Sequence, residues 1–102
     1  MDPRSDCIDF INPATGEKFG EVRMTTEEEV MLARREMAAA QSTWAAKPLR
    51  ERARIVKQFQ RVVIDAADEL TAIVNQDHGK SRGDALHEIV MTVDKIHQYA
   101  RL

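Results

Sequence analysis

Residues 48–80 read PLRERARIVKQFQRVVIDAADELTAIVNQDHGK, and this stretch indicates the fold because it has the pattern of one long helical arm. Pro48 suits the first position of a helix, since its ring presets φ and it lacks only an N–H that would be unpaired there. Gly79 suits a helix end, because glycine adopts the left-handed conformation without a Cβ clash. Between them, apolar residues recur at helical spacing and predict a buried face: Leu49, Ala53, Val56, Phe59 and Val63.

The arm is expected to bend at Asp65, which can cap a second helix with Asp68 and Glu69 in its first turn. A last helix is expected after the arm, with Ser81 and Asp84 as its cap. This last helix runs to the end of the sequence without a stop signal, which indicates a truncated chain. Its apolar stripe consists of Leu86, Ile89, Val90, Val93, Ile96 and Ala100.

Upstream of the arm, residues 8–11 and 18–22 are expected to pair as two short strands. They flank the sequence NPATGE at residues 12–17, in which Asn12 can bond the backbone ahead of it and Gly16 supplies a positive φ. This combination predicts a β-hairpin, which is only marginally stable unless it packs on another element.

A helix is expected to follow the hairpin. Thr26 and Glu29 have the spacing of a capping box, in which each side chain satisfies an orphan backbone N–H of the other residue. The apolar face of this helix is expected to be core, and it contains Val30, Ala33, Met37, Ala40 and Trp44.

The sequence therefore predicts a mainly α fold, an N-terminal β-hairpin followed by three to four antiparallel amphipathic helices. A tail and the hairpin occupy residues 1–24, with residues 1–6 expected to be frayed, and a helical segment occupies residues 25–102. We expect its helices at about residues 26–46, 48–64, 66–78 and 82–101.

Composition limits the class of protein. The chain has 102 residues, enough for one small domain, and a net charge of −2 that gives no indication of nucleic acid or an anionic membrane as a partner. No apolar run approaches the length of a membrane span. The single cysteine, Cys7, excludes an intrachain disulfide and fits a reducing compartment, so we expect a cytoplasmic protein.

Motifs for chemistry are weak. The Gly79-Lys80-Ser81 sequence lacks the earlier glycine of a phosphate-binding loop, because Val74 stands at that position. Cys7 lies between carboxylates that favour the neutral thiol. The three histidines have no metal-ligand spacing: His78, His87 and His97.

A basic stripe lies along the arm and consists of Arg50, Arg54, Lys57 and Arg61. Such a stripe can bind phosphate groups. It lacks interleaved aromatic residues, and acidic residues are available for pairing, so we expect a solvated or intramolecularly paired face. The available acids are Glu27, Glu28, Glu29, Glu36 and Glu51.

An ordered set of phrases resembles a known family. The order of these phrases resembles that in the N-terminal segment of the NAD(P)-dependent aldehyde dehydrogenase superfamily. They are INPATGE, GEV, TTEEEV, a Trp before PLRERARIV, ADEL, an acidic residue before GK, and the ending QYARL. The match covers nearly all of residues 11–102. Residues 41–54 and 99–101 look most like succinate-semialdehyde dehydrogenases.

The resemblance implies a segment of an α/β enzyme that oxidises an aldehyde to a carboxylic acid with NAD or NADP. In that family the Rossmann-like cofactor domain and the catalytic domain, with its nucleophilic cysteine, lie outside the segment that this chain resembles. We therefore expect no catalytic or cofactor-binding residue here, an inactive chain in isolation, the rest of the dehydrogenase as partner, and a homo-oligomer for the full-length enzyme.

One family site is implied within this chain. Many members hold a structural monovalent cation through backbone carbonyls just before the NPATG turn and through the acidic residue before GK, which are Phe10, Ile11 and Asp77 here. Carbonyl and carboxylate oxygens suit hard cations. Asp77 as an ordinary surface carboxylate remains an alternative, and a stand-alone helical protein-interaction module remains the alternative for the chain as a whole.

Overall fold

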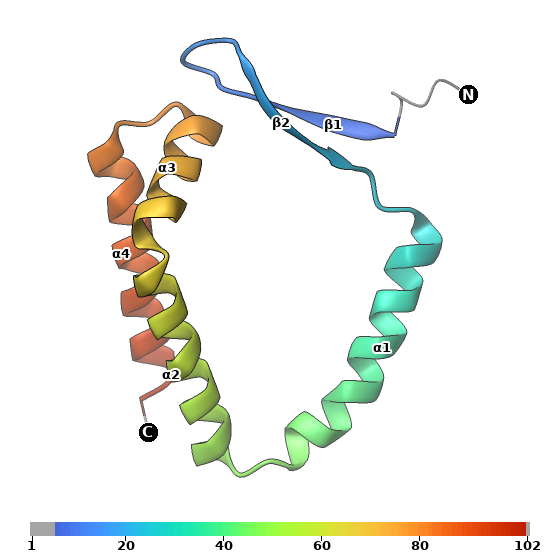
Figure 1. Cartoon of the computed structure of the whole chain (residues 1–102). Coiled ribbons are helices and arrows are strands. Elements are labelled where there is room, and N and C mark those ends of the chain that lie inside the picture. The colour runs from blue at the N-terminus through green and yellow to red at the C-terminus, as the bar shows by residue number, and fades with distance from the viewer. Residues whose placement is uncertain (1–5, 102) are drawn as a thin grey trace.

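The computed structural model describes residues 6–101 as a two-stranded antiparallel hairpin followed by four helices (Figure 1). The strands are β1 (Cys7–Ile11) and β2 (Lys18–Arg23), and the helices are α1 (Glu27–Ala46), α2 (Leu49–Asp65), α3 (Ala67–His78) and α4 (Arg82–Tyr99). The mainly α class with an N-terminal hairpin is confirmed. Most of the stretch expected to be frayed, residues 1–5, lies outside the described residues.

The hairpin turn forms as its residues predict. The side-chain Oδ1 of Asn12 accepts a hydrogen bond from the Ala14 N–H at 2.9 Å, and the Asn12 carbonyl accepts one from the Gly16 N–H at 2.7 Å. Gly16 has a φ of 75°, which favours glycine. The strand register shifts between Phe10 and Ile11, so the pairing becomes irregular just before the turn.

Local side chains determine where α1 begins. The Thr26 hydroxyl accepts a hydrogen bond from the Glu29 N–H at 3.2 Å, and the Glu29 carboxylate accepts one from the Thr26 N–H at 2.8 Å, so the capping box is confirmed. Glu29 also pairs with Arg23 at 2.6 Å and thereby links the end of β2 to the helix. Hydrogen bonds from Arg23 and from the Thr26 backbone lower the pKa of Glu29 to about 2.

Two helix boundaries differ from expectation. Helix α2 begins at Leu49 with Pro48 as its N-cap, one residue later than predicted. Asp65 does not cap α3; Ala66 occupies that position without a side-chain hydrogen bond. The reason is that the backbone stays near the helical region at Ala66 (φ −93°, ψ 8°), with its N–H bonded to Val62 and its carbonyl to Leu70, so the bend leaves little for a capping side chain to satisfy.

The core lies where α2, α3 and α4 meet: α3 continues from the end of α2, and α4 packs alongside both (Figure 1). Its buried residues are Val63, Thr71, Ala85, Ile89 and Ala100. The predicted α2 stripe is only partly correct, because Leu49 and Phe59 are both 57% exposed.

Helix α1 stands apart from the other three helices and has no buried residue (Figure 1). The expectation that its apolar face is core is therefore wrong for this chain: Met37 is 66% exposed, Val30 54% exposed, and Trp44 only half-buried. The apolar spacing identified the face correctly, but no described element covers it.

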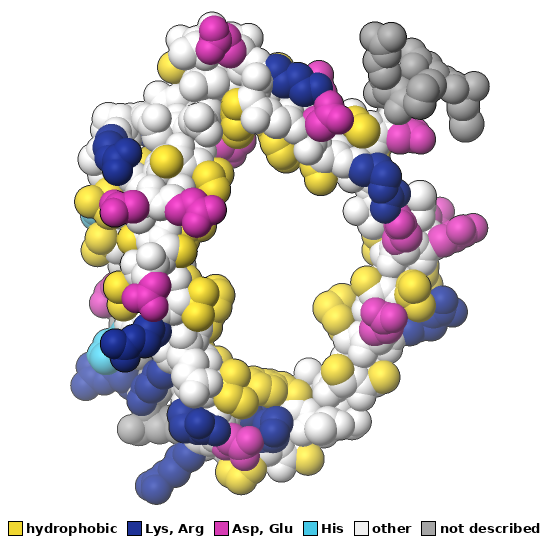
Figure 2. Space-filling view, viewed as in Figure 1, with side chains coloured by type: hydrophobic (Ala, Val, Ile, Leu, Met, Phe, Trp, Pro, Cys, Tyr) yellow, Lys and Arg dark blue, Asp and Glu magenta, His cyan; other side chains and the backbone are white. Residues whose placement is uncertain are grey.

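The described chain forms an open ring. Its extents are 47 × 40 × 16 Å and its radius of gyration is 18.0 Å, against about 13 Å for a compact chain of 100 residues. Figure 2 shows the open centre and hydrophobic side chains along much of its inner edge. The ring consists of the α2–α3–α4 unit on one side and α1 on the other, joined above by the hairpin.

Candidate functional site

The hairpin meets the helical unit at the C-terminal end of α3. Gly79 ends α3 in the left-handed conformation with a φ of 65°, as its sequence position predicts. A Cβ atom at Gly79 would lie 2.9 Å from Cγ of Pro13 and 3.2 Å from the backbone N of Ala14. Gly79 therefore serves both as a helix terminator and as the point on which the turn rests. The second role has no signal in the local sequence, because the two segments are distant in the chain.

The segments that carry the predicted cation ligands approach each other near this junction. Phe10 and Ile11 directly precede the turn, and Asp77 lies two residues before Gly79, so the fold brings both segments to one place. The Phe10 ring stacks on Phe19 with centroids 5.9 Å apart, which holds the end of β1 in position.

The donor set fits a hard cation in kind but supplies few ligands. Asp77 has a half-exposed carboxylate, 3.2 Å from Nε2 of its neighbour His78. Together with the carbonyls of Phe10 and Ile11 it would supply at least three oxygens, whereas cations such as Ca²⁺ take six or more. Within residues 6–101, no group of three His, Cys, Asp or Glu residues could hold a metal ion by side chains alone.

The loop after Gly79 is fully engaged in local contacts. The Lys80 side chain pairs with Glu88, and the Lys80 carbonyl accepts a hydrogen bond from Nδ2 of Asn75. The Ser81 hydroxyl accepts a hydrogen bond from the Asp84 N–H at 3.1 Å and caps α4 as predicted. These contacts agree with the sequence argument that Lys80 is not part of a phosphate-binding loop.

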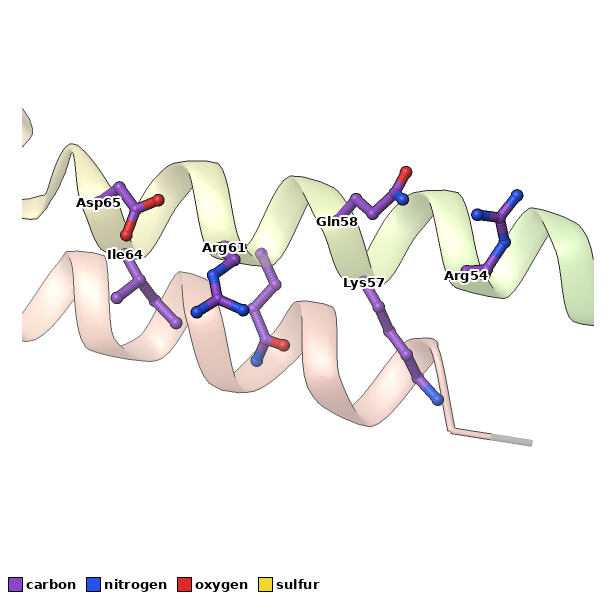
Figure 3. A pocket seen from close by; sticks show the side chains of 7 residues that line it. Arg54, Lys57, Gln58, Arg61, Ile64 and Asp65 are labelled. Carbon is purple, nitrogen blue, oxygen red and sulfur yellow. The ribbon is translucent and has the colours of Figure 1, made fainter.

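A basic furrow of about 410 Å³ runs along α2 and borders α4, because its lining residue Gln60 donates a hydrogen bond to the Val93 carbonyl of α4. Figure 3 shows its labelled side chains along the helix, from Arg54 to Asp65. The stripe was expected to be a solvated or an intramolecularly paired face, and among the described residues it is solvated: its cations are exposed, while Glu51 pairs with Lys47 at 3.0 Å and Glu29 with Arg23. Within the described range, none of the four cations of the stripe forms an ion pair, because α1 and its acids lie on the far side of the ring.

An apolar groove of about 520 Å³ lies between α2 and α4. Phe59 is 57% exposed and Tyr99 is 85% exposed at this groove, so large apolar surfaces face solvent. The lining residues are Val56, Phe59, Met91, Thr92, Lys95, Ile96 and Tyr99. Such a surface is typical of a face that another segment or protein covers.

The described residues contain no arrangement suited to nucleophilic catalysis. Cys7 is free and half-buried at the start of β1, between Asp6 and Ile8. The histidines are separated along α3 and α4. In the part of the chain that the structure describes, no helix is long and apolar enough to cross a membrane.

Comparisons with known proteins are consistent with one family. The model of the aldehyde dehydrogenase family matches residues 1–102. Malonate-semialdehyde dehydrogenase of Bacillus pumilus is 37% identical over 78 residues, which is 76% of this chain and 16% of that protein. A protein of Mycobacterium ulcerans, provisionally named an NADP(+) succinate-semialdehyde dehydrogenase, is 32% identical over 88 residues, 86% of this chain and 17% of that protein.

A solved structure shows the same fold. The NAD-dependent benzaldehyde dehydrogenase of Corynebacterium glutamicum matches with a TM-score of 0.88 and 23% identity, covering 92% of this chain and 20% of that one. The chain thus spans between 16% and 20% of the length of these proteins. The predicted resemblance is confirmed: the chain belongs to the aldehyde dehydrogenase family and matches the N-terminal segment of such enzymes.

Proposed function

We propose that this chain is the N-terminal scaffold of a cytoplasmic NAD(P)-dependent dehydrogenase that oxidises an aldehyde, of the semialdehyde class, to a carboxylic acid. The observation that carries the proposal is the open ring with an apolar inner edge, in a chain of this family that spans about a fifth or less of its relatives. An uncovered apolar surface of this kind requires further protein to bury it. The remainder of a dehydrogenase is the partner that family membership supports.

In this proposal the chain has a structural role and contributes no catalytic residue. When bound to the complete enzyme, NAD or NADP would supply the hydride acceptor, and no residue among 6–101 is assigned as a ligand of the cofactor or of the aldehyde. Helix α1 and the α2–α4 groove present apolar side chains to the cofactor and catalytic domains, and the hairpin keeps the two at a constant separation. The isolated chain is expected to be inactive, and the complete enzyme is expected to be a homo-oligomer.

The test is a pair of measurements. The 102-residue chain is assayed for aldehyde-dependent reduction of NAD and of NADP with malonate semialdehyde, succinate semialdehyde and benzaldehyde, and no turnover above buffer is expected. In parallel, the chain replaces the corresponding segment of the Bacillus pumilus relative, with the deletion of that segment as control. The chimaera is expected to fold and retain activity. Turnover by the isolated chain, or a folded but inactive chimaera, would contradict the scaffold proposal.

We also propose that the junction at Gly79 holds a monovalent cation through the carbonyls of Phe10 and Ile11 and the carboxylate of Asp77, with water or downstream oxygens completing the shell. The proximity of the two segments supports this proposal. In the chimaera, Asp77→Asn is expected to remove the difference in thermal stability between potassium and tetramethylammonium buffers. An undiminished difference in that variant would exclude Asp77 as a ligand.

The alternative, a stand-alone interaction module, shares the exposed apolar groove of Phe59 and Tyr99. The two functions differ in their partner. A scaffold segment should have its groove covered only when the dehydrogenase domains are present, in the chimaera. A stand-alone module should leave its groove equally accessible in the isolated chain and in the chimaera. Binding of a fluorescent hydrophobic dye to the groove, compared between the isolated chain and the chimaera, distinguishes the two functions.

A further inference from the structure

Arg52 stands at one end of the apolar groove between α2 and α4. It lies four residues before Val56 and seven before Phe59, the two α2 residues that line the groove, so all three share one stripe of the helix. The same stripe continues to the buried Val63. Arg52 is therefore a half-buried cation on the packed side of α2, unlike the four exposed cations of the basic stripe.

The C-terminal end of α4 lies at the level of Arg52. Nε2 of Gln60 donates a hydrogen bond to the Val93 carbonyl at 3.1 Å, which sets the alignment of the two antiparallel helices. Arg52 precedes Gln60 by eight residues, and α4 ends six residues after Val93, at Tyr99. At about 1.5 Å rise per residue, these two segments reach nearly the same level. Figure 1 shows the C-terminal end of α4 beside α2, with which α4 is in contact.

The guanidinium of Arg52 lacks an acceptor for one of its N–H groups. Its Nε is buried, and no atom among residues 6–101 accepts a hydrogen bond from it. The adjacent carboxylate of Glu51 pairs with Lys47 at 3.0 Å and does not reach Arg52. A buried donor without an acceptor destabilises a fold, and a charged donor does so more strongly. The described chain thus holds Arg52 in position without the partner that its charge requires.

The groove beside Arg52 indicates what kind of segment carries that partner. Its lining is mostly apolar, and Phe59 and Tyr99 are largely exposed there. The charged residue of the lining is a second cation, Lys95, whose Nζ lies 3.4 Å from the side-chain oxygen of Gln98 and pairs with no carboxylate of the described chain. An apolar segment that covers the groove also removes Arg52 from water, and a cation buried without an anion is strongly unfavourable. The covering segment therefore has to bring an acid.

We propose that Arg52 binds a carboxylate carried by an apolar protein segment that covers the α2–α4 groove. A carboxylate matches the planar guanidinium fork with two parallel hydrogen bonds, so it satisfies Nε and one terminal nitrogen together once the side chain turns toward the groove. A phosphate backbone fits less well, because the groove is lined mainly by apolar side chains. The source of the segment rests on the proposed function, in which the rest of a dehydrogenase covers this groove.

The test compares Arg52→Met with Arg54→Met, each in the isolated chain and in the chimaera with the Bacillus pumilus relative. The readout is hydrogen exchange of the α2 amides by mass spectrometry. Methionine removes the guanidinium and keeps a long side chain in the helix. Arg54 is the matched control, because it is an exposed, unpaired cation of the same helix that lines the basic furrow and not the groove.

The expected result differs between the two proteins. In the chimaera, Arg52→Met should speed exchange of the α2 amides by about tenfold, because it leaves the carboxylate of the covering segment buried and unpaired. Arg52→Lys should have a smaller effect, since it keeps the charge but not the fork. Arg54→Met should have none. In the isolated chain neither Arg52→Met nor Arg54→Met should speed exchange, because the acceptor is missing there.

Two results would overturn the proposal and leave the scaffold role intact, since that role is tested by the activity of the unmutated chimaera. The first is equal exchange in the Arg52→Met and Arg54→Met chimaeras. The second is faster exchange of Arg52→Met already in the isolated chain, which would show that Arg52 bonds to its own chain, for example to the last carbonyls of α4.

A second experiment supplies the carboxylate within the isolated chain and does not need the chimaera. Tyr99, which lies at the Arg52 end of the groove and is 85% exposed, is changed to Glu, with Tyr99→Gln as the control for the lost ring. In urea unfolding at pH 7, Tyr99→Glu should have an unfolding constant about threefold lower than Tyr99→Gln, and this difference should disappear when Arg52→Met is added. A difference that is absent, or that persists in the Arg52→Met background, would exclude Arg52 as the carboxylate site.

Discussion

Gly79→Ala tests whether the hairpin is held by the end of α3. The substitution adds one methyl group at a residue with a φ of 65°, where the end of α3 closely approaches the hairpin turn. Two separate effects follow. Alanine is disfavoured in the left-handed region, and its Cβ would lie 2.9 Å from Cγ of Pro13 and 3.2 Å from the backbone of Ala14.

The two effects can be separated by magnitude. A left-handed alanine costs about 1–2 kcal/mol, and forcing an extra methyl into a packed contact costs about 1–3 kcal/mol more. Gly16 provides the matched control, because it has a similar φ of 75° and nothing within 4 Å of its virtual Cβ. Gly16→Ala should therefore show the conformational cost alone, about 1–2 kcal/mol.

The assay is urea unfolding followed by circular dichroism. The dependence of the unfolding free energy on urea concentration is compared between variants, because a changed slope would indicate a different unfolding transition. Gly79→Ala is expected to lower the free energy of unfolding by at least about 1 kcal/mol more than Gly16→Ala. Combining it with Pro13→Ala should recover part of that excess, since residues in contact show coupling of about 0.5–3 kcal/mol. Equal losses for the two glycine variants, or no coupling with Pro13→Ala, would refute the contact.

Three further predictions concern local stability. Ile89→Ala, at 8% exposure, should destabilise the helical unit by about 2–5 kcal/mol, whereas Val90→Ala, at 54% exposure, should change it by less than about 0.5 kcal/mol, both measured by urea unfolding. Ser81→Ala should cost about 1 kcal/mol in the same assay, because it removes the α4 cap. Because the pKa of Glu29 is lowered from 4.5 to about 2, its contribution is complete above pH 4.5 and is lost as the pH falls toward 2. An acid titration of the Thr26 amide signal by NMR should show this step, and Glu29→Gln should abolish it.

Local chemistry was predictable from the sequence wherever a short segment satisfies its own backbone. The Thr26 and Ser81 caps, the Asn12 turn and the two positive-φ glycines all form as expected, because each depends on partners within a few residues. The Asp65 cap failed for the same physical reason. A cap is needed where the chain leaves the helix, and at Ala66 the chain bends while remaining nearly helical.

Tertiary pairing was not predictable, because periodicity identifies an apolar or charged face but not its neighbour. Met37 has the spacing of a core residue and is exposed. Arg54 and Lys57 were expected to be either solvated or paired within the chain, and the structure was needed to show that they are exposed while the acids of α1 lie across the ring. For the candidate cation site, Phe10, Ile11 and Asp77 came from the family resemblance, while the Pro13–Gly79 contact that brings their segments together required the structure.

The helices of this chain differ in what stabilises them. The α2–α3–α4 unit has a buried core, whereas α1 depends on a capping box and on intrinsic helical preference. Most helical stability in proteins comes from packing of an amphipathic face, and the described chain does not provide that packing for α1. The hairpin and α1 are therefore the part of the chain that a covering domain should stabilise most. It is also the part where a scaffold role predicts the largest change in hydrogen-exchange protection between the isolated chain and the chimaera.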